Sequence, residues 1–543
     1  MAPAQTPPAG DGGPVPAPSR QSRGFVLVKG VSFNLVSLVL SAVLSLILTP
    51  IMIRGLGQYY YGMWVLVMSL VDQYGLLDIG MGSTLARFTG YFAGSERRSA
   101  LDETLSTSMA FAVWISIAIC VATAAFTPLL PGWFAIGQSD RKTFTALVLL
   151  LGLTTAIGFP ERMLSAYLRG LQRFDLFNIV GTSVLIARSV LVMAALLLGY
   201  GVLTVAAITA LTGLASLVCH YGMVRRADPD LSLGLAHVRR ARLRELFGFS
   251  VYVFIASIGS RLVSRINSIV IARVLGVAFV TPFSIGSRLM DYFMGVFGAV
   301  HGPVMSSMSE LAGRSQHREL QWLFLRATKF TCLLSFFIGS LLLFDGRTLL
   351  TLWLGRSGVD ITAAYYVLAI LVPCYVALSS QLPSSIVIYA RARHQILAWL
   401  VLGEGAANLG LSIYWAREYG LLGVALGTTV PALINQALII PWYALRVANV
   451  PAGVFLRQSI LRPAAAAAIF ALGCHLTAAH SPRLLPFALA ILGQTLAYAV
   501  ISYLVGLSGQ ERDAVRRHVR RWLSSFRRPR PLPVGESCPR LEA

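Results

Sequence analysis

Residues 30–57 read GVSFNLVSLVLSAVLSLILTPIMIRGLG, and the part from 30 to 53 contains no Asp, Glu, Lys or Arg. An α-helix needs about 20 predominantly apolar residues to cross the hydrocarbon core of a bilayer. The run is also longer than the apolar core of a secretory signal peptide, which spans about 7–15 residues. It therefore predicts a first transmembrane helix that is retained in the protein.

The rest of the chain repeats this pattern. Of the 543 residues, 56% are hydrophobic and only 13% are charged, against about 25% charged in a typical soluble domain. Further apolar windows lie at 62–80, 106–127, 143–166, 177–199, 202–222, 247–272, 279–304, 328–345, 362–388, 396–416, 421–443, 461–479 and 484–507. Because backbone in lipid must satisfy its hydrogen bonds internally, the windows predict an all-α polytopic membrane protein of about 14 transmembrane helices.

The basic residues are distributed asymmetrically between the predicted loops. With the N-terminus placed in the cytoplasm, 33 of the 45 Lys and Arg residues fall in cytoplasmic segments, 8 in outer loops and 4 within the membrane. Cytoplasmic loops of membrane proteins carry such an excess. The count, together with the even number of predicted helices, therefore predicts that the N- and C-termini are both cytoplasmic.

The net charge of +22 would suggest nucleic-acid binding in a soluble protein. Here the most basic stretches, 225–244 and 511–530, belong to a loop and to the C-terminal tail, outside any soluble domain. Membrane topology accounts for them, and contact with anionic membrane lipids is the functional alternative. No nucleic-acid partner is expected.

An internal repeat links the two halves of the chain. Arg54-Gly55-Leu56-Gly57 recurs as Arg273-Val274-Leu275-Gly276, and Tyr200-Gly201 recurs as Tyr419-Gly420, both at an offset of 219 residues. The period covers six predicted helices, an even number, so both copies keep the same orientation in the membrane. The repeat predicts two six-helix lobes related by a parallel pseudo-twofold axis, with two C-terminal helices appended.

The predicted organisation follows from the windows and the repeat. Its segments are a disordered cytoplasmic N-tail (1–24), an N-lobe of helices 1–6 (25–226), a basic cytoplasmic linker (227–246), a C-lobe of helices 7–12 (247–446), helices 13 and 14 (447–507) and a basic cytoplasmic C-tail (508–543). The Pro-, Gly- and Ala-rich composition of the N-tail is typical of disorder.

Helices 1 and 7 carry polar residues where a bilayer disfavours them. Spacings of three and four residues place each set on one helix face. The sets are Asn34, Ser41 and Ser45 on helix 1, and Ser257, Arg261, Ser264 and Arg265 on helix 7. Ser264 is the repeat partner of Ser45, so both faces are expected to line one central cavity that binds the substrate.

Arg261 and Arg265 decide what this cavity would hold. An arginine near the middle of a membrane helix costs roughly 2.5–3.5 kcal/mol on insertion scales, and no acidic residue lies on the same predicted helix. Both are therefore expected to face a water-filled or anion-occupied cavity. A guanidinium group donates two parallel hydrogen bonds to a phosphate, so two of them one turn apart suit a diphosphate.

The alternative is that the intramembrane arginines pair with acids for structural reasons. Arg288 precedes Asp291 by three residues on predicted helix 8 and is expected to pair with it. Arg188, on helix 5, fits either a ligand-facing or a structural role. The candidates for ion pairing or ion coupling are Asp72, Asp291, Arg288 and Glu404.

Three segments carry a resemblance to a known family. They read RGLGQYYYGMWVLVMSLVDQYGLLDIGMG (54–82), YLRGLQRFDLFN (167–178) and YARARHQILAWLVLGEGAANLGLSIYWAREYGLLGVALGT (389–428). Together they resemble the multidrug/oligosaccharidyl-lipid/polysaccharide exporter superfamily, and within it the Wzx-type O-antigen and exopolysaccharide flippases. The similarity covers roughly residues 25–445.

The resemblance implies a two-lobed bundle that works by alternating access without a cofactor. It also implies a substrate of sugars on undecaprenyl diphosphate, moved from the cytoplasmic to the periplasmic leaflet of the bacterial inner membrane. Other polysaccharide-assembly proteins are candidate partners. Two alternatives lie within the superfamily. One is a lipid II-type flippase, which the extra helix pair resembles, and the other is a drug/cation antiporter, for which the arginines of helix 7 have the wrong electrostatic sign.

An enzyme is the third class considered. A membrane glycosyltransferase or polymerase would need an acidic catalytic group beside a sizeable loop, and the longest outer loops, 128–142 and 346–361, contain no paired acids. The six cysteines show no CxxC or Cys/His spacing, so no metal or disulfide is expected. The sequence predicts a transporter without enzymatic activity.

Overall fold

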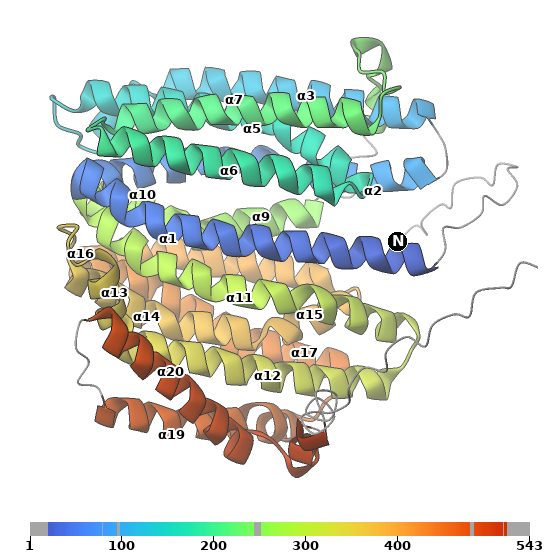
Figure 1. The fold of residues 1–543 in the computed structure, drawn as a ribbon, viewed down its shortest axis with the longest axis vertical. Helices are drawn as coiled ribbons and strands as arrows, with labels where there is room; N and C mark the ends of the chain where they lie inside the picture. Colours follow the sequence, from blue (N-terminus) through green and yellow to red (C-terminus); the bar gives the residue numbers. More distant parts are fainter. Residues whose placement is uncertain are drawn as a thin grey trace, which may run out of the picture. The chain divides into compact units, whose positions relative to one another are not determined.

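The computed structural model describes residues 20–78, 80–94, 98–243, 251–477, 483–513 and 515–517. Within these ranges the chain forms α-helices with short 3-10 and π-helical turns, and no β-strand (Figure 1). It divides into two compact units, Met1–Phe254 and Ile255–Ala543. The predicted all-α membrane fold is confirmed.

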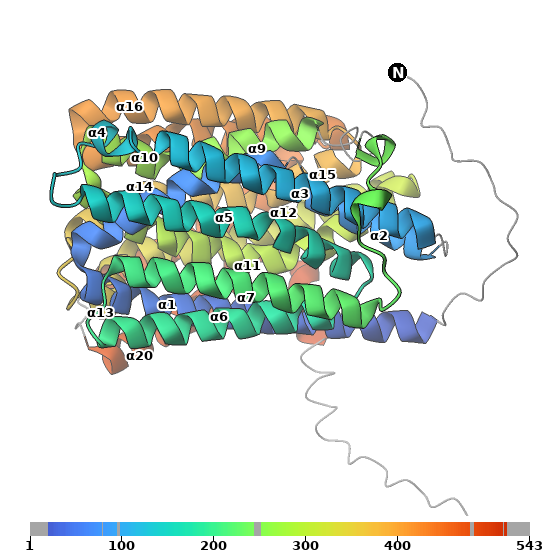
Figure 2. The ribbon, with the colours of Figure 1, turned by 90° about the horizontal axis from the view of Figure 1, so that it is seen from above.

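The first unit consists of long helices joined by short turns. Its elements are α1 (Arg20–Asp72), η1 (Gln73–Asp78), α2 (Met81–Gly94), α3 (Arg98–Phe126), α4 (Leu130–Trp133), α5 (Arg141–Gly170), α6 (Phe174–Leu197), α7 (Val202–Ala227) and η2 (Leu235–His237). The central helix is α5, which packs on α1, α2, α3, α6 and α7, and Figure 2 shows it between α3 and α7. Its fully buried Phe144, Leu147 and Leu151 recur every three or four residues and so share one face.

The second unit has more and shorter helical pieces. Its elements are α9 (Val251–Ser264, beginning in the first unit), α10 (Ile266–Val274), η3 (Val277–Phe279), α11 (Val280–Gly313), α12 (His317–Phe344), α13 (Gly346–Leu354), α14 (Ile361–Ser380), α15 (Leu382–Ala390), α16 (His394–Leu433), η4 (Ile434–Ile439), α17 (Ile440–Ala448), α18 (Ala452–Phe455), η5 (Leu456–Ile460), α19 (Leu461–Thr477), α20 (Leu484–Ile501) and η6 (Ser502–Gly506). Here the central helix is α14, which packs on α11, α12 and α16.

The two units repeat one backbone feature at the offset found in the sequence. Gly57 has φ 78° and ψ 163°, and Gly276 has φ 110° and ψ 159°. Side chains on L-residues clash in this region, so glycine is required at both positions. The central helices α5 and α14 also occupy equivalent places in the sequence repeat. The pseudo-twofold axis relating the two lobes stays a prediction.

Ten helical segments of the described chain are long and apolar enough to cross a membrane. Two of them are longer than one crossing needs: Leu40–Asp78 has 39 residues and Gln395–Ala448 has 54. Each contains a glycine with non-helical backbone, Gly57 in the first and Gly420 in the second. Dividing both at the glycine, and adding α9–α10 and α11, assigns a helix to each of the 14 predicted windows.

The chain reverses direction at Gly420 and forms a tight helical hairpin. A Cβ atom added to Gly427 would lie 2.5 Å from the backbone nitrogen of Ser412. Thr428 Oγ1 donates to Asn408 Oδ1 at 3.1 Å, and Ser412 Oγ lies 3.3 Å from the Val424 carbonyl oxygen. Small residues that permit such close backbone approach are a main source of helix association in lipid.

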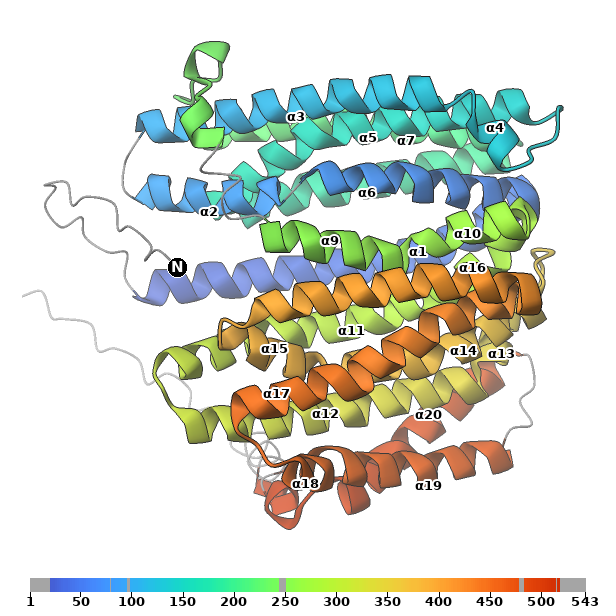
Figure 3. The same ribbon diagram turned by 180° about the vertical axis from the view of Figure 1, so that it is seen from behind.

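Within the second unit, the C-terminal helices α19 and α20 pack on α12, and Figure 3 shows α19 beside α12. The Tyr498 hydroxyl of α20 donates to the Leu333 carbonyl of α12 at 2.7 Å. Its ring stacks on Phe337 of α12 with centroids 4.8 Å apart, and meets Phe470 of α19 edge-on at 5.0 Å. At the other end of the chain, α1 begins at Arg20, so the last residues of the tail predicted as disordered are helical.

Candidate functional site

The predicted helix 7 is made of two helical pieces, α9 and α10. Arg265 lies at the junction, between Ser264, the last residue of α9, and Ile266, the first residue of α10. Its backbone N–H still donates to the Arg261 carbonyl at 2.9 Å. The interruption is therefore a local kink, and the two arginines remain one turn apart.

One face of this helix packs tightly on α16. A Cβ atom on Gly259 would lie 2.6 Å from the backbone carbonyl carbon of Val401, so the glycine permits a close approach of two backbones. Asn408 Nδ2 of α16 donates to the carbonyls of Leu262 at 3.0 Å and Val263 at 3.2 Å. These contacts fix which face of α9 turns away from α16.

The predicted polar residues of helix 7 are accessible within the second unit. Ser264 and Arg265 are exposed, and Ser257 and Arg261 are half-buried. In contrast, Gly259 on the packed face is buried. The arrangement agrees with a polar stripe along one face of the helix.

An acid from the neighbouring helix α11 joins the arginines. Asp291 interacts electrostatically with Arg288, three residues earlier on the same helix, and also with Arg265. From the sequence, Asp291 was expected to pair with Arg288 and was one of the candidate acids for the other intramembrane arginines. Together with Arg261, this cluster contains three guanidinium groups and one carboxylate, so its formal charge is +2. This net positive charge attracts anions.

Glu404 of α16 occupies a different environment. Its carboxylate is buried and accepts hydrogen bonds from Asn435 Nδ2 at 2.5 Å and Gln436 Nε2 at 3.2 Å, both from the π-helical turn η4. The structure thus supplies Glu404 with amide donors rather than with the arginine partner considered for it from the sequence.

A second polar network joins α10 to the hairpin of α16. Asn267 Nδ2 donates to Thr428 Oγ1 at 2.9 Å, and both Thr428 Oγ1 and Ser412 Oγ donate to Asn408 Oδ1, at 3.1 Å and 2.9 Å. All four side chains are buried. The network ties helix 7 to helices 11 and 12 of the second unit and thereby fixes the arginine-bearing face.

Helix 1 supplies the remaining predicted cavity residues. Ser41 and Ser45 of α1 are half-buried, and Thr49 Oγ1 donates to the Ser45 carbonyl at 2.7 Å. The side chain of Asn34 lies outside the described part of the chain. Asp72, at the C-terminal end of α1, is half-buried in the first unit.

Arg188 lies in the first unit beside a charged cluster that the sequence analysis did not identify. It is half-buried on α6 and interacts electrostatically with Glu161 of α5. The Glu161 carboxylate is 3.1 Å from His220 Nδ1 of α7 and accepts a hydrogen bond from Ser216 Oγ at 3.3 Å. The neighbouring acid favours the structural role for Arg188 over the ligand-facing one.

Glu161 and His220 were not predicted as site residues, because they lie near the ends of the predicted spans 143–166 and 202–222. In the structure α5 continues to Gly170 and α7 continues to Ala227, which places both residues well inside their helices. The sequence indicates these extensions, because the apolar residues MLSAYL (163–168) follow Glu161 and GMV (222–224) follow His220.

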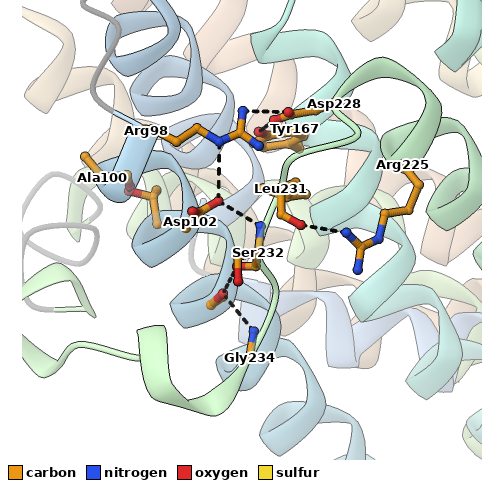
Figure 4. A network of polar contacts seen from close by, with 11 residues as sticks. Arg98, Ala100, Asp102, Tyr167, Arg225, Asp228, Leu231, Ser232 and Gly234 are labelled. Atoms are coloured by element: carbon orange, nitrogen blue, oxygen red, sulfur yellow. Dashed lines mark hydrogen bonds and ion pairs between the residues drawn. The ribbon is translucent and has the colours of Figure 1, made fainter.

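The start of the predicted linker is tied to the first unit by the network in Figure 4. The Asp228 carboxylate is 2.6 Å from Arg98 Nη1 of α3 and accepts a hydrogen bond from the Tyr167 hydroxyl of α5, also at 2.6 Å. The Ser232 backbone N–H donates to Asp102 Oδ1 at 3.1 Å, and Arg225 Nη1 donates to the Leu231 carbonyl at 2.6 Å.

The contacts continue along α3. The backbone N–H of Arg239 donates to Thr107 Oγ1 at 3.0 Å, and the guanidinium groups of Arg239 and Arg242 lie 3.6 Å and 3.3 Å from the Glu103 carboxylate. Arg242 also lies over the Phe92 ring of α2, 5.0 Å from its centroid. Two basic residues of the linker, Arg239 and Arg242, therefore have protein partners, although the sequence assigned such residues to topology or to lipid contact.

The chain belongs to a known family. A profile described as polysaccharide biosynthesis protein matches residues 51–362, which is more than half of the chain. A Shigella flexneri protein named as an O-antigen transporter is 21% identical over 432 residues, covering 78% of this chain and 99% of that protein.

Solved structures show the same fold at lower sequence identity. One described as the lipid II flippase MurJ in an inward closed conformation has a TM-score of 0.67 and 14% identity, and covers 88% of this chain and 98% of its own. An inward-facing multidrug resistance MATE family transporter of the MOP superfamily has a TM-score of 0.65 and 15% identity, and covers 76% of this chain and 94% of its own.

These findings confirm the resemblance seen in the sequence. The protein is a multi-pass membrane protein of the polysaccharide biosynthesis family, and it has the fold of the two solved transporters. Within the described residues, no group of three or more His, Cys, Asp or Glu side chains is placed to hold a metal ion.

Proposed function

We propose that the protein moves an oligosaccharide linked to undecaprenyl diphosphate from the cytoplasmic to the periplasmic leaflet, for surface polysaccharide biosynthesis. The single observation that carries this proposal is the accessible cationic face of α9–α10. There, Arg261 is half-buried and Arg265 exposed, one turn apart, while the opposite face packs on α16. An anionic diphosphate suits this face, and the cation of a drug/cation antiporter does not.

In this proposal Arg261 and Arg265 bind the diphosphate while the two lobes alternate between inward- and outward-open states. Ser257, Ser264, Ser41, Ser45 and Asn34 would contribute hydrogen-bond donors for phosphate or sugar. A diphosphate carries about two negative charges, and a cell interior negative by 100 mV favours its outward movement by about 2.3 kcal/mol per charge. The membrane potential can therefore assist transport without a coupling ion, and Asp72, Asp291 and Glu404 are the candidates if one is used.

The experiment that tests the site replaces its arginines and measures both export and protein level. Arg261→Ala and Arg265→Ala each remove a forked donor, and we expect export of the polysaccharide to be lost while the protein remains inserted at normal abundance. Arg261→Lys keeps the charge but loses the two-point geometry, so it should restore export only in part. Arg273→Ala is the matched control, because it removes an exposed arginine from the other end of α10.

Two results would contradict the proposal. Full export by the double variant Arg261→Ala/Arg265→Ala would show that neither arginine binds cargo. A large drop in membrane abundance would instead identify Arg265 as the structural partner of Asp291, with which it interacts in the second unit.

The proposed orientation has its own test. With 33 of 45 basic residues in the segments assigned to the cytoplasm, a reporter fused after Leu507 should be active in the cytoplasm and inactive in the periplasm. A periplasmic signal would mean that one predicted span does not cross the membrane. The window 461–479, with its weakly apolar run of alanines, is the candidate for such a span.

A further inference from the structure

A cavity of about 540 Å³ opens between α12, the turn formed by α18 and η5, the start of α19 and the segment after η6. Its volume falls within the range of about 300–1,000 Å³ found for small-molecule sites. The charged residues of its lining are Arg326, Lys329, Arg457, Arg462 and Glu511. Four basic groups and one acid give a formal charge of +3, and none of them belongs to the proposed cargo site.

The one carboxylate of the cavity is already engaged. Glu511 accepts a hydrogen bond from the buried Lys329, and both the backbone N–H and the hydroxyl of Ser508 donate to it at 2.8 Å. Arg326 Nε lies 3.9 Å from its other oxygen. These contacts hold the C-terminal segment against α12, and the charge of Glu511 is offset by Lys329 and Arg326.

Two arginines of the cavity are therefore left to attract an anion. Arg457 and Arg462 are exposed, and neither forms an ion pair with any other residue that the structure describes. They lie five residues apart, across the π-helical turn η5 and the first turn of α19. The amides of Gln458 and Gln510 also line the cavity and add neutral donors. Guanidinium and amide donors around one cavity are the groups that bind phosphate.

The cavity lies where the predicted span 328–345 of α12 begins. Trp322, one turn before Arg326, is 54% exposed and carries the Arg326 guanidinium over its ring, 4.1 Å from the centroid. Exposed tryptophan and arginine at the end of a membrane helix are typical of the headgroup region. The distribution of basic residues assigns this end to the cytoplasmic side.

We propose that this cavity binds the phosphate group of an anionic phospholipid of the cytoplasmic leaflet. Arg457 and Arg462 bind the phosphate, and Trp322 packs beside the headgroup at the edge of the bilayer. Basic pockets between membrane helices on the cytoplasmic side bind anionic headgroups in this manner. A free phosphate ion would bind the same arginines but would not pack on the exposed indole of Trp322. The indole therefore favours a lipid as the source of the phosphate group.

The test measures lipid retention by native mass spectrometry on the purified full-length protein, with phosphatidylglycerol and phosphatidylcholine as probes. The protein should retain phosphatidylglycerol in preference to phosphatidylcholine. Because one basic residue near an anionic lipid contributes about fivefold in affinity, Arg457→Ala/Arg462→Ala should weaken phosphatidylglycerol binding about thirtyfold. Both side chains are exposed and their removal leaves the Lys329–Glu511 pair in place, so the variant should fold.

The matched control is Arg446→Ala. Arg446 is also exposed and lies over a tryptophan, Trp442, 3.8 Å from its ring centroid, but it belongs to α17 and not to the cavity. This variant should retain phosphatidylglycerol as the unaltered protein does. Equal retention by the Arg457/Arg462 variant would overturn the proposal.

Two further measurements test the recognition of phosphate and the choice between a lipid and a soluble phosphate. Arg457→Lys/Arg462→Lys retains the charge without the forked donors and should bind with intermediate affinity, so lipid retention as weak as in the alanine variant would count against phosphate recognition. Displacement of bound phosphatidylglycerol by millimolar inorganic phosphate would overturn the lipid assignment and identify a soluble phosphate instead. Neither measurement depends on polysaccharide export.

Discussion

The Asp228 carboxylate ties the linker after α7 to the first unit, and its removal has a predictable cost. Alanine at this position leaves the fully buried Tyr167 hydroxyl without its acceptor, which costs about 1–3 kcal/mol. The Arg98 side chain is 41% exposed and can return to water, so loss of its ion pair adds only about 0.5–1 kcal/mol. We therefore expect Asp228→Ala to lower the free energy of unfolding by about 1.5–4 kcal/mol.

A double-mutant cycle separates this explanation from a general weakening of the linker. Tyr167→Phe removes the hydroxyl together with its need for an acceptor, at a cost of about 1.5–3 kcal/mol for a hydrogen bond to a charged group. In Tyr167→Phe/Asp228→Ala no hydroxyl is left unsatisfied. The double variant should therefore lose about 1–2 kcal/mol less than the sum of the two single changes.

The assay is unfolding of the purified protein in mixed micelles by a denaturing detergent, followed by tryptophan fluorescence. Asp230→Ala is the control, because Asp230 is an exposed carboxylate two residues further along the same linker. It should change the free energy of unfolding by less than about 0.5 kcal/mol. The reasoning would be refuted if Asp228→Ala behaved like Asp230→Ala, or if the effects of the two single changes simply added.

Two further predictions concern the second unit. Gly427→Ala places a Cβ atom 2.5 Å from the Ser412 backbone nitrogen and should lower the free energy of unfolding by about 1–3 kcal/mol. The control is Gly410→Ala on the same helix, where the added Cβ atom meets open space. This variant should leave the free energy of unfolding unchanged or raise it. Burial by itself raises the pKa of Glu511, but hydrogen bonds from Lys329 and Ser508 outweigh it and hold the pKa below the ordinary value of 4.5. The ionised carboxylate therefore stabilises the folded state fully above pH 4.5 and loses this effect as the pH falls through the folded-state pKa. The difference in unfolding free energy between the unaltered protein and Glu511→Gln should be largest at neutral pH and shrink below pH 4.5; a difference independent of pH between 7 and 3 would contradict it.

The membrane helices were predictable because lipid imposes one simple requirement on sequence. A chain that crosses the bilayer must remain apolar for about 20 residues, and each of the 14 predicted windows coincides with a helix. The repeat was visible for a related reason. Gly57 and Gly276 share a backbone conformation that only glycine adopts easily, so the RGLG and RVLG sequences carry the same turn.

The polar contacts were predictable only within one helix. Arg288 and Asp291 lie one turn apart, and their interaction follows from spacing alone. The interaction of Arg265 with Asp291, and that of Arg188 with Glu161, joins different helices. Such pairs depend on how helices rotate and slide against each other, which hydropathy does not record.

The repeat allows residues of helix 7 to be compared with those at the corresponding positions of helix 1. At the offset of 219, Arg261 and Arg265 correspond to Ala42 and Leu46 of helix 1, while Ser264 corresponds to Ser45. The copies therefore share the serine and the glycine turn but not the charge. The first unit forms the same helix position without arginine, and an arginine inside a membrane helix costs roughly 2.5–3.5 kcal/mol. A charge that only one copy carries, on an accessible face, supports the proposal that Arg261 and Arg265 bind a ligand. Placing arginines at the corresponding positions of helix 1, as Ala42→Arg/Leu46→Arg, in a protein that lacks Arg261 and Arg265 would test this. Recovery of export would show that the charge serves the cargo, and no recovery despite normal insertion would show that its position in the second unit is essential.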